Sequence, residues 1–238
     1  MIITPFKNPF SARRSSSVFK LPNALHEWNY QNATDVGTTI TMPDTGTIGG
    51  LPMANPDAAS KPTLGVDGVE FDGIIQYLMN TVANFRGADA TGVLHCLISI
   101  PTGDSTLSFC SSDNATTTEY LIFDSSPTNK ARILTRIGAT IRSLETTATY
   151  SGFKLLTSVQ DGTQAYILID GVEIVSYSTS TLTTEWFNGF TNRDNISFGG
   201  LISSSPVFKP SKLKYCAYSP YVSKAAAISD ANLILNGL

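Results

Sequence analysis

The acidic residues are the natural place to look for catalysis, because glycoside hydrolysis needs two carboxyl groups about 5–10 Å apart. Along a β-strand such a pair occupies positions i and i+2, which share one face. Of the six glutamates, only Glu70 has an acid two residues away, Asp72, and Gly73 breaks the strand directly after it. Asp170 and Glu173 stand three apart across a turn, so their side chains point in different directions. We therefore expect no catalytic residues and no enzymatic activity.

Histidine and cysteine offer no alternative chemistry. His26 and His95 are the only imidazoles, and His95 stands next to Cys96 in an apolar run. Neighbouring residues of a strand face opposite sides of the sheet, so this pair cannot form a nucleophile–base hydrogen bond. With Cys110 and Cys216, the chain has three cysteines, an odd number without metal-type spacing. We expect packed side chains here, with no zinc site, other metal site or disulfide framework.

One segment, residues 185–194, has the composition of a sugar-binding loop. Trp186 could stack on a sugar ring, and Asn188, Asn192 and Arg193 could hydrogen-bond its hydroxyls. In the alternative interpretation, Trp186 and Phe190 fold inward and close one end of the domain.

The first twenty residues show no period and are interrupted by two prolines and a serine triplet. We interpret residues 1–20 as an extended arm that docks on a partner, because ordering such a segment costs entropy unless something fixes it. A frayed terminus is the alternative. The anchors expected to bind the partner are aromatic or basic: Phe6, Lys7, Phe10, Arg13, Arg14 and Phe19.

From residue 21 onward the patterns are those of β-strands. Residues 93–100 form a continuous apolar run, which indicates a strand buried on both faces. Residues 153–175 predict three strands joined by two turns, each with an Asp-Gly pair that supplies positive φ. Residues 132–144 are taken as one strand, and residues 43–68 as a loop. At the end, Ser223 could cap one or two helical turns within residues 225–235.

Composition excludes several classes of protein. The 238 residues carry a formal charge of −3, so a nucleic-acid partner is not expected. No apolar run approaches the roughly 18 residues that would span a membrane, and the N-terminus lacks the pattern of a secretory signal. The many predicted strands lack helical crossovers, which favours two packed antiparallel sheets.

Three segments, in this order, resemble the laminin-G-like, concanavalin-A-like jelly-roll superfamily. The first is Val69–Gly73 with Gln76–Leu78, the second is Phe153–Val159 followed by Ala165–Val175, and the third is Asn195–Gly200, Lys212–Tyr218 and the tail Ser223–Leu235. The resemblance implies an all-β jelly-roll sandwich over residues 21–238, with a short C-terminal helix. Members of this superfamily include lectins, glycan hydrolases and structural or adhesion proteins of bacteriophages.

The resemblance also implies a calcium ion as an alternative to no cofactor, because such domains often hold one with loop oxygens. Each candidate ligand also has a sufficient reason to be in a turn. The candidates are Asp67, Asp72, Asp113, Asn114 and Asp194.

Two hypotheses follow. In the first, the protein is a non-enzymatic structural component of a virion that docks on other virion proteins through residues 1–20, and any self-association forms a homo-oligomer. In the second, it is an adhesion module that binds surface glycans through the loop Trp186–Asp194. We place the virion role first, and it rests on the resemblance.

Overall fold

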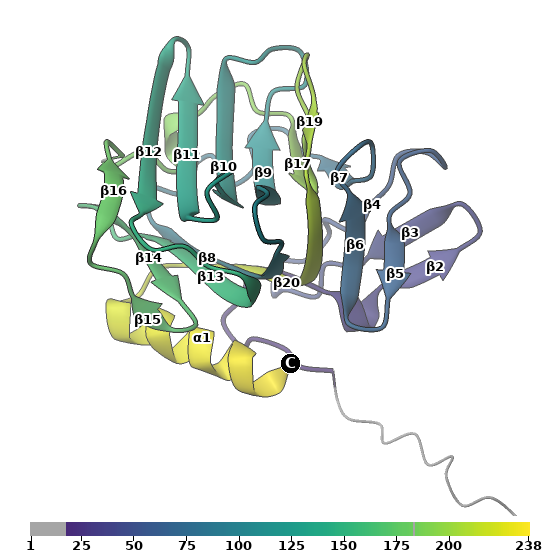
Figure 1. Ribbon diagram of the computed structural model, residues 1–238, viewed down its shortest axis with the longest axis horizontal. Helices are drawn as coiled ribbons and strands as arrows, with labels where there is room; N and C mark the ends of the chain where they lie inside the picture. The colour runs from purple at the N-terminus through teal and green to yellow at the C-terminus, as the bar shows by residue number, and fades with distance from the viewer. Residues whose placement is uncertain (1–17, 183) are drawn as a thin grey trace, which may run out of the picture.

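The computed structural model describes residues 18–182 and 184–238, which form two packed antiparallel sheets (Figure 1). The eight-stranded sheet has the order β15 (Val172–Glu173), β14 (Ala165–Ile169), β13 (Gly152–Gln160), β8 (Gly92–Ile100), β20 (Pro210–Ser219), β6 (Gly68–Asp72) and β5 (Thr63–Gly65), with β1 (His26–Asn29) also paired to β20. The predicted all-β sandwich is confirmed.

The second sheet has ten strands and is joined by smaller elements. Its order is β16 (Tyr177–Ser180), β12 (Thr140–Thr146), β11 (Ala131–Ile137), β10 (Glu119–Ser125), β9 (Thr106–Ser112), β17 (Asn195–Phe198), β7 (Leu78–Thr81), β4 (Met53–Ala54), β3 (Thr39–Met42) and β2 (Thr34–Val36). A separate hairpin pairs β18 (Gly200–Leu201) with β19 (Val207–Phe208). Two 3-10 turns, η1 (Tyr30–Asn32) and η2 (Phe187–Gly189), and one helix, α1 (Lys224–Gly237), complete the described elements.

Strand β8 shows why the core has two layers. Its side chains alternate between the space between the sheets, where Cys96 and Ile98 lie, and the opposite face, where Leu97 packs with Ala231 and Ile234 of α1. All its residues except Ser99 are buried, as the unbroken apolar run predicts. Helix α1 thus covers part of the outer face of the eight-stranded sheet, over β8, β13, β14 and β20 (Figure 1).

Three local predictions are corrected by the structure. Residues 132–144 form two strands, β11 and β12, because Gly138 adopts a φ of 60° and allows a tight turn. The expected loop at 43–68 contains β4, which pairs with β3 and β7, and β5, which forms a tight hairpin with the following strand β6. The C-terminal turns form one continuous helix of 14 residues, capped as predicted by the Ser223 side chain, which accepts a hydrogen bond from the Ala226 N–H at 3.1 Å.

The last aromatic residue of the expected arm packs within its own chain. The ring of Phe19 lies 5.7 Å from that of Tyr215, and a methyl group at Gly237 would collide with it. Phe19 therefore fills part of the space between α1 and β20, and its contact with a partner stays a prediction. The other predicted anchors, Phe6, Lys7, Phe10, Arg13 and Arg14, lie outside the described residues.

Replacement of Phe19 by alanine should lower the free energy of unfolding by about 1–2 kcal/mol, since a half-buried ring loses its contacts with Tyr215 and α1. Urea denaturation followed by tryptophan fluorescence measures this change. Val18→Ala is the matched control, because Val18 is 40% exposed and should leave the midpoint unchanged. An unchanged midpoint for Phe19→Ala would mean that this contact is not formed in solution.

Candidate functional site

The acidic pairs considered for catalysis are engaged in ordinary structural contacts. Glu70 pairs with Lys212 at 2.8 Å, and the Asp72 carboxylate accepts hydrogen bonds from the backbone N–H groups of residues 74–76. Those three bonds hold the pKa of Asp72 below its ordinary value despite some burial. Asp170 pairs with Lys154 at 2.7 Å. Each of these carboxylates thus closes a turn or pairs with a lysine.

His95 and Cys96 face opposite sides of β8, as expected. The Nδ1 atom of His95 lies 2.9 Å from the Thr157 hydroxyl, and complete burial lowers the pKa of the imidazole to about 3. On the other face, the Sγ atom of Cys96 lies 3.5 Å from that of Cys216, and both thiols are buried. These groups are packed side chains of the core.

Of the calcium candidates, Asp113, Asn114 and Asp194 lie beside one another, whereas Asp67 and Asp72 belong to other turns. Asp113 accepts hydrogen bonds from the Ala115 N–H and the Thr116 hydroxyl, and Asp194 accepts one from the Asn114 N–H at 2.9 Å. Asp67 pairs with Lys212 at 2.8 Å. Within residues 18–182 and 184–238, no cluster of three or more His, Cys, Asp or Glu side chains could hold a metal.

The predicted sugar-binding loop turns its aromatic residues inward. Trp186 is 0% exposed and Phe190 1%, so the expectation that Trp186 presents a face to a sugar is wrong. The indole packs edge-on against Phe123 at 5.4 Å and against Phe187 at 5.2 Å. The structure agrees with the alternative interpretation, in which Trp186 and Phe190 fold inward. Both side chains belong to the core cluster between the sheets.

Arg193 is also buried, at 1% exposure, so the expectation that it hydrogen-bonds a sugar is corrected. Its guanidinium donates to the carbonyl oxygens of Phe85 and Phe187 and to the side chains of Asn84 and Ser111, at 2.6–3.2 Å. It therefore ties the loop after β7 to the loop that contains η2. Burial lowers the pKa of Arg193 to about 10, which leaves the group charged near neutral pH.

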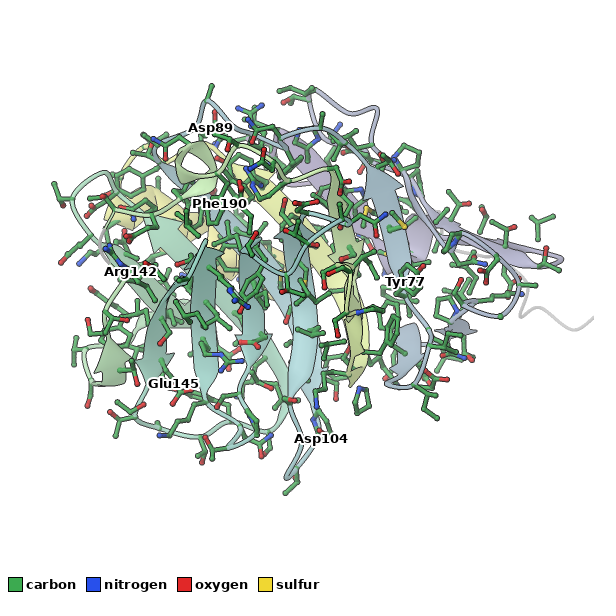
Figure 2. All side chains as sticks on the ribbon, turned by 90° about the horizontal axis from the view of Figure 1, so that it is seen from above. Tyr77, Asp89, Asp104, Arg142, Glu145 and Phe190 are labelled. Atoms are coloured by element: carbon green, nitrogen blue, oxygen red, sulfur yellow. The ribbon has the colours of Figure 1, made fainter. Side chains whose placement is uncertain are left out.

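The two asparagines of the same loop remain at the surface. Asn192 is exposed and donates from Nδ2 to Glu119 Oε2 at 2.8 Å, while the backbone N–H groups of Thr191 and Asn192 donate to Oε1. Asn188 is exposed, and its N–H donates to the Asp89 carbonyl at 3.1 Å. Phe190 and Asp89 consequently lie near each other at this end of the molecule (Figure 2). Hydrogen bonds to Glu119 and to the Asp89 carbonyl thus hold this loop in place at the surface.

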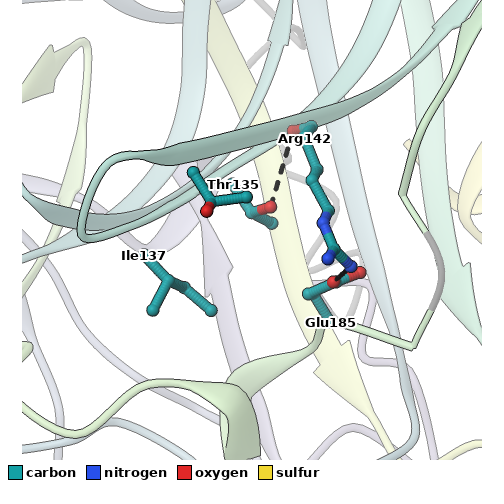
Figure 3. A pocket seen from close by; sticks show the side chains of 5 residues that line it. Thr135, Ile137, Arg142 and Glu185 are labelled. Atoms are coloured by element: carbon teal, nitrogen blue, oxygen red, sulfur yellow. Dashed lines mark hydrogen bonds and ion pairs between the residues drawn. The ribbon is translucent and has the colours of Figure 1, made fainter.

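A cleft opens beside this loop, between the loop and the hairpin β11–β12 (Figure 3). It has a volume of about 190 Å³, and its lining residues are Thr135, Ile137, Thr140, Arg142 and Glu185. Arg142 and Glu185 form an ion pair across it. Thr135 donates a hydrogen bond to the Arg142 carbonyl at 3.4 Å. The cleft thus combines a charged donor, a charged acceptor, two hydroxyls and the partly exposed Ile137 side chain.

This cleft does not follow from the sequence when residues 132–144 are taken as one strand. With Gly138 as a turn, Arg142 falls on the same face of β12 as the buried Leu144, two residues apart. An arginine in phase with core residues is a signal that could have identified it. Glu185 was considered only as a catalytic acid, and its partner Arg142 lies 43 positions away.

Comparisons with known proteins bear on the fold. The scan against protein-family models finds no match, and no curated protein matches in sequence. Among solved structures, Trypanosoma rangeli sialidase is similar with a TM-score of 0.62 and 12% identity, covering 90% of this chain and 33% of that one. The same sialidase in complex with sialic acid gives 0.62 and 11%, with the same coverage.

The chain spans about a third of the length of the sialidases it matches. The carbohydrate-binding module CBM40 of Ruminococcus gnavus IT-sialidase, bound to α2,3-sialyllactose, gives a TM-score of 0.48 at 12% identity, covering 58% of this chain and 80% of that one. The sialidase similarity agrees with the jelly-roll type of sandwich predicted from the sequence. No helix within the described residues is long and apolar enough to cross a membrane.

Replacement of Arg193 by methionine should lower the free energy of unfolding by at least about 2 kcal/mol, because two buried carbonyl groups lose a charged donor. Chemical denaturation measures the loss. Arg136→Met is the control. It removes another arginine, which lies near the C-terminal end of β11 and donates to the Gly138 carbonyl. Equal effects of the two substitutions would contradict the role assigned to Arg193.

Stability should fall between about pH 6.5 and pH 4, because the unfolded chain protonates His95 while the folded one does not. The folded pKa of about 3 lies below the unfolded value, so this contribution is complete above pH 6.5 and is lost as the pH falls toward 3. Denaturation midpoints at pH 7, 6, 5 and 4.5 test this, with His95→Gln as the comparison. A wild-type profile as flat as that of the variant over this range would contradict it.

Proposed function

We propose that the protein is a non-enzymatic carbohydrate-binding module, and that the cleft between hairpin β11–β12 and the loop containing η2 holds one sugar ring of a glycan. The observation that carries the proposal is the Arg142–Glu185 ion pair at this cleft. The proposal keeps the loop predicted from the sequence and changes the residues that would contact the sugar.

The chemistry of the cleft suits a sugar. A sugar hydroxyl both donates and accepts, so a carboxylate and a guanidinium side by side can bind two neighbouring hydroxyls. The Thr140 hydroxyl can serve in either role, whereas the Thr135 hydroxyl, which donates to the Arg142 carbonyl, can only accept. Ile137, 40% exposed, offers a surface for the C–H groups of the ring. At about 190 Å³ the cleft is smaller than the pockets of drug-sized ligands, which matches a single ring.

The comparisons support the scaffold and suggest a first ligand. A sandwich of this shape occurs within Trypanosoma rangeli sialidase, and one structure of that enzyme contains sialic acid. The ligand belongs to that protein, and the present chain covers a third of it. Sialylated glycans are therefore the first compounds to test.

The absence of catalysis remains part of the proposal. Glu185 faces an arginine across the cleft, and hydrolysis by the usual route needs a second carboxyl group at that place. The role in a virion finds no support in the described residues, since Phe19 packs inside its own chain. The remaining arm anchors lie outside them.

A glycan array that includes sialylated, neutral and sulfated compounds tests the proposal, with affinities of the strongest compounds measured by calorimetry. Arg142→Gln should weaken binding about tenfold or more, because one charged hydrogen bond is lost. Lys61→Gln, which removes a cation paired with Asp35 elsewhere on the surface, should leave binding unchanged.

Melting curves check that both variants are folded. If the protein binds no compound on the array, or if Arg142→Gln binds as tightly as the wild type, the cleft is not a carbohydrate site.

A further inference from the structure

A second concavity lies on the face of the ten-stranded sheet that points away from the core, where no helix covers the described strands. The hairpin β18–β19 rises beside β9, and the groove between it and β10–β11 has a volume of about 270 Å³. The floor is aliphatic and mostly buried. It consists of Leu107, Ile122, Leu134, Leu201 and Val207.

The polar groups of the groove are mainly hydrogen-bond donors. Lys209 lines it and makes no ion pair among the described residues. Ser105, 5% exposed, also lines it, and its hydroxyl has no hydrogen-bond partner within the described part of the chain. Most buried polar groups in proteins have a hydrogen-bond partner, so the Ser105 hydroxyl can form a hydrogen bond with a ligand in the groove.

Arg132 is the third donor, and a buried acid holds it in place. Asp124, 2% exposed, accepts from Arg132 Nε at 2.9 Å and from Nη2 at 2.5 Å. The remaining terminal nitrogen, Nη1, makes no hydrogen bond among the described residues. Both oxygens of Asp124 are thus occupied, and the nearby Glu145 lies 3.6 Å from Lys130. The groove therefore offers no free carboxylate to a ligand.

We propose that this groove binds a short segment of a partner protein in which an aliphatic side chain stands next to a carboxylate. The side chain would lie on the floor, and the carboxylate would pair with Lys209 and Arg132. Strand β19 pairs only with β18 in the described structure, so its other edge can add an extended peptide.

Two other occupants fit the groove less well. The floor carries no aromatic plate for a sugar; its one aromatic neighbour, Tyr120, is half-buried at the side. The chain's own first residues include Lys7, Arg13 and Arg14, which Lys209 and Arg132 would repel. Charge and shape together favour an acidic, aliphatic peptide.

An array of octapeptides in which leucine alternates with aspartate, asparagine or lysine tests the proposal with the full chain. The Leu-Asp peptides should bind best, and the Leu-Lys peptides should not bind. For the best peptide, fluorescence anisotropy should show that Lys209→Gln weakens binding about fivefold. Val207→Asp, at a residue 43% exposed, places a negative charge in the groove and should abolish binding.

Lys154→Gln, on the eight-stranded sheet, is the control and should bind like the wild type. Arg142→Gln should also keep peptide binding, which separates this groove from the cleft of the proposed function. Equal binding of the three peptide sets, or no effect of Lys209→Gln and Val207→Asp, would overturn the proposal. Loss of glycan binding in Lys209→Gln, with no peptide bound, would make the groove a carbohydrate site instead.

Discussion

The end of the sandwich that carries the cleft depends on one buried cation. Arg193 replaces water with the carbonyl oxygens of Phe85 and Phe187 and with two side chains, and it stacks within 5.1 Å of the Phe187 ring centre. A guanidinium without these partners would be costly to bury. The loop after β7 and the loop that contains η2 are thereby fixed to each other. This also fixes the positions of Glu185 and Asn188, which belong to the loop that contains η2.

The elements that pack on the outer faces of the two sheets decide which parts of those faces remain accessible to a ligand. Helix α1 packs its Ala227, Ala231 and Ile234 side chains on the eight-stranded sheet and covers the part of that face formed by β8, β13, β14 and β20. The corresponding face of the ten-stranded sheet is covered only in part, by the hairpin β18–β19. Both proposed binding concavities involve this sheet, one beside the ends of β11 and β12 and one across β10 and β11.

The charged residues in and beside these concavities are arranged to hold donors in position. Asp124 orients Arg132, and Glu185 pairs with Arg142. Asp124 is buried deeply enough that its pKa is raised even beside an arginine, because loss of water outweighs the pairing. By contrast, hydrogen bonds hold the pKa values of two turn acids below the ordinary value despite some burial. Backbone N–H groups donate to Asp72, and the Thr163 hydroxyl together with backbone N–H groups donates to Asp161. Asp72 and Asp161 thus stabilise turns, whereas Asp124 and Glu185 position arginines.

The sequence by itself determined the strands with strong local patterns, such as β8 and the hairpins with Asp-Gly turns, because burial period and positive φ are local properties. It also indicated the loop beside the cleft from its composition. Only the tertiary structure decided that Trp186 and Arg193 point inward. The local sequence of a loop is the same whether its Trp or Arg side chain faces water or packs against a neighbouring loop. The pairing of Arg142 with Glu185 and the groove beneath β18–β19 likewise join segments far apart in the chain, which no local pattern specifies.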